Sequence, residues 1–177
     1  IMTTATLTVR LLTGFDDPTF GPGEWTRLLA SGETDSVCLT WALQRTWWET
    51  LGHGRLLLIV AEGDGRPVAL APLFEDGGMI FNLCPEDRLD FVGDVSEPAV
   101  LDALLDAARS SVSDFCGFRF YFISDRCQTA ARLHEAGRRT GLTFLDEGAL
   151  PAPALHVGRN PDAALAATRK KSLMRHE

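Results

Sequence analysis

Two apolar runs joined by a short turn constrain the fold of this chain most strongly: residues 55–74, RLLLIVAEGDGRPVALAPLF. The runs 56–61 and 68–74 flank an Asp-Gly turn, a pattern that predicts a β-hairpin. Both runs are nearly continuous rather than alternating, which is typical of strands covered on both faces. We therefore expect the hairpin at the centre of a sheet with helices packed on it. Pro67, which has no N–H, is expected at a strand start or bulge, and Pro72 weakens the second strand near its end.

Hydrophobic periodicity and capping residues predict the other elements. Helices are expected at 24–30, 40–51, 98–112 and 129–140, and strands at 6–12, 79–84, 118–123, 142–145 and 154–157. The three central strands follow one another directly, which favours antiparallel pairing, and the later β-α-β units favour parallel pairing. We predict an α/β (α+β) fold with a mixed, mostly antiparallel central sheet and helices on both faces.

A last helix is expected from Asn160-Pro161-Asp162, which supplies an N-cap residue, a proline at the first helical position and an acid in the first turn. The sequence that follows, AALAATRKKSLMRHE, contains no glycine or asparagine stop. We expect the native chain to continue beyond Glu177; the alternative is a natural C-terminus that frays.

Charge is unevenly distributed along the chain, whose net charge is −7. Arg169, Lys170, Lys171 and Arg175 against Glu177 give residues 169–177 a net charge of +3, which leaves −10 for the rest. An acidic body repels phosphates, so we expect no nucleic-acid partner.

Several kinds of site and segment are not indicated. The sequence has no run of about 18 apolar residues and no charged-then-apolar leader, and its four cysteines are scattered. We expect a cytoplasmic protein with reduced thiols and no membrane span. The four histidines lie far apart with no cysteine at ligand spacing, so no metal site is expected. No nucleophile elbow, P-loop or dinucleotide fingerprint occurs, and the catalytic residues are unknown.

An acidic cluster leads into the helix expected at residue 98. Its members are Asp87, Asp90, Asp94 and Glu97. They either provide favourable charge at a helix N-terminus or form a polar rim that holds an amine or hydroxyl substrate.

An ordered set of segments resembles the N-terminal half of the FemAB-like and CelD-like branch of the GNAT acetyltransferases. The set comprises TWALQRTWWETLG, the hairpin ending in ALAPLF, then LDFVGD, and finally RKKSLMRHE, and it covers most of residues 20–177. The resemblance implies a GNAT-like domain at 1–158 and, at 159–177, a helix leading to a second GNAT domain outside this chain. That second domain would bind acetyl-CoA or another acyl-CoA, with an amine acceptor in a cleft between the two.

The chain departs from the GNAT pattern at the donor loop. A GNAT donor site has a glycine-rich loop after the fourth strand, whose N–H groups and following helix hold a pyrophosphate. The matching place here reads LDFVGDVSEPAV, with one glycine, Gly93, and with Asp94 and Glu97 where the pyrophosphate would lie. Two like charges about 4 Å apart repel by about 4 kcal/mol at a surface-like dielectric. We expect no donor cofactor in this chain.

Two functional hypotheses remain. In the first, the chain is the non-donor half of an acyltransferase. Asp94 and Trp47 are then candidate acceptor contacts, and Arg169, Lys170 and Lys171 lie at the junction of the domains, facing an anionic ligand. The exposed junction face packs on the second domain or in a homodimer. In the alternative, the chain is a stand-alone, degenerate GNAT-like module that binds a small ligand or a protein partner without catalysis. Trp41 and Trp48, seven residues apart, are expected to share a buried helix face.

Overall fold

The computed structural model describes residues 6–85 and 88–151. The chain divides into two compact units, 1–144 and 145–177. Every described helix and strand belongs to the first unit, and the described part of the second, 145–151, contains neither. Residues 142–145 form neither a helix nor a strand, so the prediction of a strand there is wrong. The strand expected at 154–157 and the helix expected from residue 160 lie outside the described residues.

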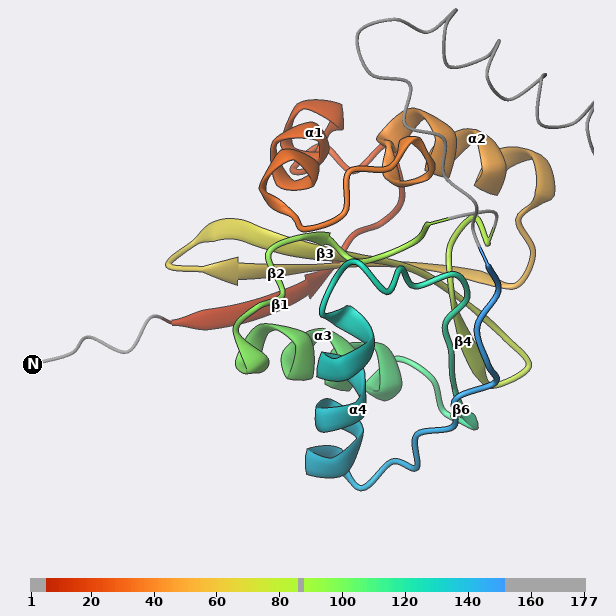
Figure 1. The fold of residues 1–177 in the computed structure, drawn as a ribbon. Coiled ribbons are helices and arrows are strands. Elements are labelled where there is room, and N and C mark those ends of the chain that lie inside the picture. Colours follow the sequence, from red (N-terminus) through yellow and green to blue (C-terminus); the bar gives the residue numbers. More distant parts are fainter. Residues whose placement is uncertain (1–5, 86–87, 152–177) are drawn as a thin grey trace, which may run out of the picture. The chain divides into compact units, whose positions relative to one another are not determined.

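The first unit alternates helices and strands (Figure 1). Their order is β1 (Leu7–Leu11), α1 (Pro22–Ser31), the 3-10 helix η1 (Val37–Leu39), α2 (Trp41–Leu51), β2 (Arg55–Gly63), β3 (Arg66–Asp76), β4 (Met79–Asn82), β5 (Val92–Gly93), α3 (Pro98–Ser110), β6 (Gly117–Arg119) and α4 (Thr129–Thr140). The four helices expected between residues 24 and 140 are present, with ends that differ by up to two residues.

The described strands form one mixed sheet. Its order is β1-β2-β3-β4-β6, and β5 also pairs with β3. Every pairing is antiparallel except that of β4 with β6, which is parallel. The predicted mixed and mostly antiparallel sheet is thus confirmed.

The central hairpin is formed as predicted. β2 and β3 pair from Arg55↔Glu75 to Gly63↔Arg66, and the turn residues Asp64 and Gly65 both have positive φ. The register shifts between Ala61 and Glu62, and Glu62 then pairs with Pro67. Proline therefore lies at a bulge, where its missing N–H costs no ladder bond.

The hairpin is apolar throughout because it has a hydrophobic core on each face. Figure 1 shows α1 and α2 on one side of the sheet and α3 and α4 on the other. Leu57 and Ile59 are buried in the core that includes residues of α3 and α4, whereas Leu58 and Val60 are buried in the core that includes residues of α1. Successive side chains of a strand point to opposite faces, so continuous burial requires both layers.

β4 and β5 lie along the same edge of β3 and are separated by residues 83–91, which we call the excursion. Leu73 of β3 pairs with Asn82, and Leu70 pairs with Val92. The excursion begins beside Pro72, whose carbonyl accepts a 2.8 Å hydrogen bond from the Leu83 N–H. Pro72 has no N–H with which to donate a second hydrogen bond to Leu83. The ladder between β3 and β4 is therefore weakest at the point where the excursion begins.

The strands expected at 79–84 and 118–123 are shorter than predicted. β4 ends at Asn82, whose side chain takes over the pairing: its Nδ2 donates to the Tyr121 carbonyl (2.9 Å), and its Oδ1 accepts from the Tyr121 N–H (3.0 Å). Beyond that point Phe122 has a φ of +55°, a left-handed conformation that ends regular strand geometry.

Candidate functional site

Two connecting segments lie side by side on the α1–α2 side of the sheet: residues 32–40, between α1 and α2, and the described parts of the excursion, 83–85 and 88–91. Hydrogen bonds join them at two places, and a close approach of Gly32 to Gly93, just past the excursion, continues the line. A Cβ on Gly32 would lie 3.0 Å from the Gly93 carbonyl, Thr34 donates to Asp90 (2.6 Å), and the Gln44 side chain bridges Cys38 and Leu83. The contacts run in opposite directions along the two segments, and we call this line of contacts the seam.

Asp90 is the buried polar centre of the seam. Its side chain accepts on both oxygens: Oδ2 from the Thr34 hydroxyl, and Oδ1 from the Thr129 hydroxyl (2.7 Å) and the Phe91 N–H (2.8 Å). Asp90, Thr34 and Thr129 are all buried. The acidic cluster of the sequence therefore divides, because Asp90 is inside the protein whereas Asp94 and Glu97 are exposed.

Gln44, fully buried in α2, closes the other end of the seam. Its Nε2 donates to the Cys38 carbonyl (2.6 Å) and lies 3.4 Å from the Leu83 carbonyl, so two acceptors determine how the amide is oriented. Its Oε1 has no hydrogen-bond partner among residues 6–85 and 88–151. A buried acceptor left unpaired costs about 1–3 kcal/mol.

An ion pair at the rim of the seam joins the α1–α2 connection to α4. Glu33 accepts from Arg132 (2.6 Å) and from the Gln128 N–H (3.1 Å), at the start of α4. The bond from the Arg132 side chain, followed by that from Gln128, lowers the pKa of Glu33, and the same bond raises the pKa of Arg132. Glu33 is thus ionised and largely neutralised by Arg132.

Asp94 lies in the loop that precedes α3. It is exposed, and its Oδ1 accepts from the Ser96 N–H (2.8 Å). Hydrogen bonds from the side chain and main chain of Ser96 lower the pKa of Asp94, which keeps the carboxylate negative. The Ser96 N–H, which could otherwise donate to a pyrophosphate, is therefore already bonded to the negatively charged Asp94 carboxylate. The residues of this loop do not fit the phosphate groups of an acyl-CoA.

The other sequence-predicted site residues lie elsewhere. Trp47 is half-buried, with its ring 5.8 Å from that of Phe74, and Trp48 packs on the same ring at 6.3 Å. Trp47 and Trp48 thus pack on the same ring, and both are partly buried against the core on the α1–α2 side. Arg169, Lys170 and Lys171 lie outside the described residues.

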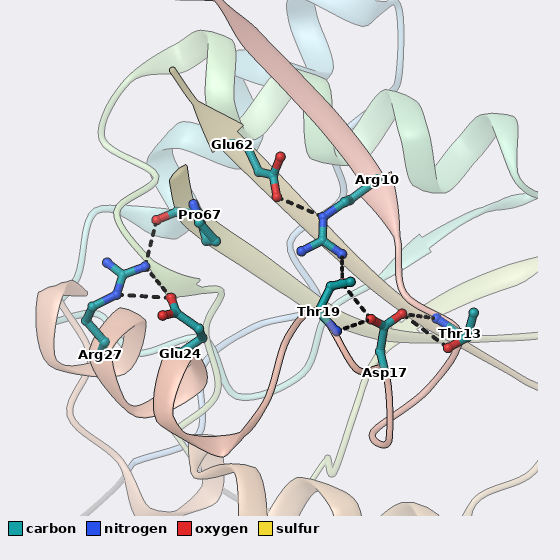
Figure 2. A network of polar contacts seen from close by, with 8 residues as sticks. All are labelled: Arg10, Thr13, Asp17, Thr19, Glu24, Arg27, Glu62 and Pro67. Carbon is teal, nitrogen blue, oxygen red and sulfur yellow. Dashed lines mark hydrogen bonds and ion pairs between the residues drawn. The ribbon is translucent and has the colours of Figure 1, made fainter. Parts of the chain in front are cut away.

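The loop that leads into α1 is held on the sheet by a polar network (Figure 2). Arg10 of β1 donates to Glu62 of β2 (2.8 Å) and to the Thr19 hydroxyl (2.7 Å). Asp17 accepts from the main-chain and side-chain donors of both Thr13 and Thr19, at 2.6–3.1 Å. The network gives the loop one conformation.

Helix α1 has its own attachments. Arg27 donates to Glu24 (2.7 Å) and to the Pro67 carbonyl at the β3 bulge (3.1 Å), as Figure 2 shows. The buried Trp25 donates from Nε1 to the Leu39 carbonyl (2.7 Å). These bonds position the segment 32–40, which forms one side of the seam.

Sequence reasoning missed most of the seam. Thr34 and Thr129 are 56 and 39 residues from Asp90, so no local pattern connects them. One signal was present: Gln44 lies three residues after Trp41 and four before Trp48, which puts an amide on the apolar face of a helix.

The fold is of the class in which a mixed sheet lies between two helical layers. No protein-family model matches the sequence, and no curated protein matches it. Five solved chains resemble the fold, among them the following three, all at low identity. An aminoglycoside N-acetyltransferase in complex with CoA has a TM-score of 0.47 and 11% identity over 86% of this chain and 98% of its own. An aminoglycoside acetyltransferase from an uncultured soil metagenomic sample, in complex with trehalose, has a TM-score of 0.47 and 14% identity over 83% and 97%. A probable acetyltransferase from meticillin-resistant Staphylococcus aureus has a TM-score of 0.46 and 9% identity over 84% and 100%.

Between residues 6 and 151, with 86 and 87 left out, no helix is both long and apolar enough to cross a membrane. In the same part of the chain, no three His, Cys, Asp or Glu side chains are placed to hold a metal ion.

Proposed function

We propose that this chain is the non-donor half of a GNAT-type N-acyltransferase and that it shapes the site of a small amine acceptor. The acyl group comes from an acyl-CoA bound by a second domain outside these 177 residues. Arg169, Lys170 and Lys171 belong to the segment that leads into that domain. Two features support this function: the resemblance of the sequence to FemAB-like and CelD-like proteins, and the charge of the loop before α3.

One observation carries the proposal: the loop before α3 presents the exposed carboxylate of Asp94, which Ser96 holds in its charged form. A fixed negative charge attracts an ammonium group and repels a pyrophosphate.

The first test is a calorimetric titration with acetyl-CoA of the 177-residue chain and of the full-length gene product. We expect binding by the longer protein and none by the chain alone. Binding by the chain alone, or by neither protein, would overturn the proposal.

The acceptor side is tested in the full-length product with spermidine as the amine probe. Asp94→Asn removes the charge and is expected to raise KM for spermidine about threefold or more at unchanged kcat, because the interaction lost acts equally on bound substrate and transition state. Asp106→Asn, at an exposed aspartate of α3, is the matched control. An equal KM for the Asp94 variant and wild type would remove Asp94 from the acceptor site.

A further inference from the structure

We propose that Asp90 is a positioning residue. Without contacting the acceptor, it sets the relative positions of three charged side chains at the rim of the seam, which are Glu33, Asp94 and Arg132. This inference rests on the proposed function only for the identity of the ligand. Its structural part concerns residues of this chain alone.

The three donors to Asp90 come from three different segments. Thr34 belongs to the α1–α2 connection, Thr129 is the first residue of α4, and the Phe91 N–H belongs to the chain that enters β5. One buried carboxyl group therefore joins two loops and a helix terminus that are far apart in the sequence.

Each of the three segments also carries one charged group of the rim. Glu33 precedes Thr34, Arg132 lies one helical turn after Thr129, and Asp94 lies four residues after Asp90. Arg132 has favourable electrostatic interactions with Glu33, Asp90 and Asp94. The positions of the rim charges thus follow from the positions of the donors that Asp90 holds.

The hydrogen bonds to Asp90 are shielded from water, so water cannot readily take the place of a lost partner. Asp90 is 6% exposed, and Thr34 and Thr129 are 6% and 0% exposed. Removing one partner of a buried hydrogen bond leaves the other unsatisfied, which is costly. The segments tied to Asp90 are therefore expected to open locally when it is removed, since local opening free energies reflect such contacts.

The structural test is amide hydrogen exchange on the 177-residue chain. In Asp90→Ala we expect protection to fall by about tenfold or more both at 38–40 and at 132–134, the hydrogen-bonded amides nearest the two arms, with β2 and β3 unchanged. The isosteric variants separate the two arms: Thr34→Val is expected to loosen mainly 38–40, and Thr129→Val mainly 132–134. They also replace Asp90→Ala if that variant does not fold. Loss of protection across β2 and β3 in the isosteric variants, or loss at neither segment, would overturn the inference.

The functional test uses the full-length product and spermidine. Thr34→Val and Thr129→Val are expected to raise KM for spermidine while leaving acetyl-CoA affinity and kcat unchanged. Local loosening without a change in KM would overturn the positioning role, whereas failure of the proposed function itself would appear separately, as the absence of spermidine-dependent turnover in wild type.

Discussion

Two aspartates, Asp17 and Asp90, each gather several hydrogen-bond donors around one carboxyl group, with different consequences. Asp90 is buried and joins separate segments, so its loss acts on packing. Asp17 is partly exposed and closes a local loop, and its four bonds come from Thr13 and Thr19. These hydrogen bonds hold the pKa of Asp17 far below its usual range, and the bond from the Thr19 side chain has the largest effect.

This shift predicts an acid-dependent stability. A carboxyl whose folded-state pKa is depressed contributes stability that is present above its unfolded pKa, about 3.9, and lost as pH falls through the folded pKa. We expect Asp17→Asn to lower the melting temperature at pH 6 and to have progressively less effect as pH falls below about 4. Thermal unfolding of both proteins between pH 2.5 and 6 measures the difference. A difference in melting temperature that is constant over this range would contradict the assignment.

At the scale of elements, the shortest strand has the tightest fit. β5 consists of Val92 and Gly93 and pairs with Leu70 and Ala69 of β3. Gly93 has a φ of +102°, and a Cβ there would lie 2.5 Å from the Val68 carbonyl. Only glycine lets the chain rejoin the sheet this closely after the excursion.

A pair of glycine substitutions separates close approach from backbone strain. Gly141, which ends α4 at a φ of +72°, has no atom within 4 Å of an added Cβ. We expect Gly141→Ala to cost about 1–2 kcal/mol through φ alone and Gly93→Ala about 3 kcal/mol or more, because backbone must also move. Urea unfolding gives both values. Equal costs would mean that the approach to Val68 is readily relieved.

At the scale of the first unit, two hydrophobic cores share one sheet. Leu57 and Leu58 are neighbours on β2, each almost fully buried, on opposite faces. A sheet common to both cores couples them, because neither helical layer can leave without exposing the apolar face of β2 and β3.

That coupling predicts one unfolding transition for the first unit. Leu57→Ala and Leu58→Ala should each cost about 2–5 kcal/mol. In urea, tryptophan fluorescence reports the α1–α2 side and far-ultraviolet circular dichroism reports all elements. We expect the two signals to coincide in both variants. Separate transitions in the Leu58 variant would show that the α1–α2 layer unfolds independently.

How much of this the sequence predicts depends on the range of the interactions. The hairpin, its bulge at Pro67 and the helices follow from periodicity and turn residues that are close together in the chain. The early end of the strand at 118–123 does not, because it depends on the side chain of Asn82, 39 residues from Tyr121. For the candidate site, the sequence proposes Asp94 as an acceptor contact, which stays a prediction, whereas the partners of Asp90 come from segments that only the folded chain brings together.

The bond between Asn82 and Tyr121 has one more consequence. Main-chain ladders tolerate almost any residue, because every amino acid except proline carries the same peptide N–H and C=O groups. Where β4 gives way to the excursion, an amide side chain substitutes for that group on both the donor and the acceptor side. The pairing at this point therefore depends on the identity of one residue. A single missense mutation in the codon for Asn82 is enough to remove it, whereas most codons of a regular strand can change without loss of a ladder bond.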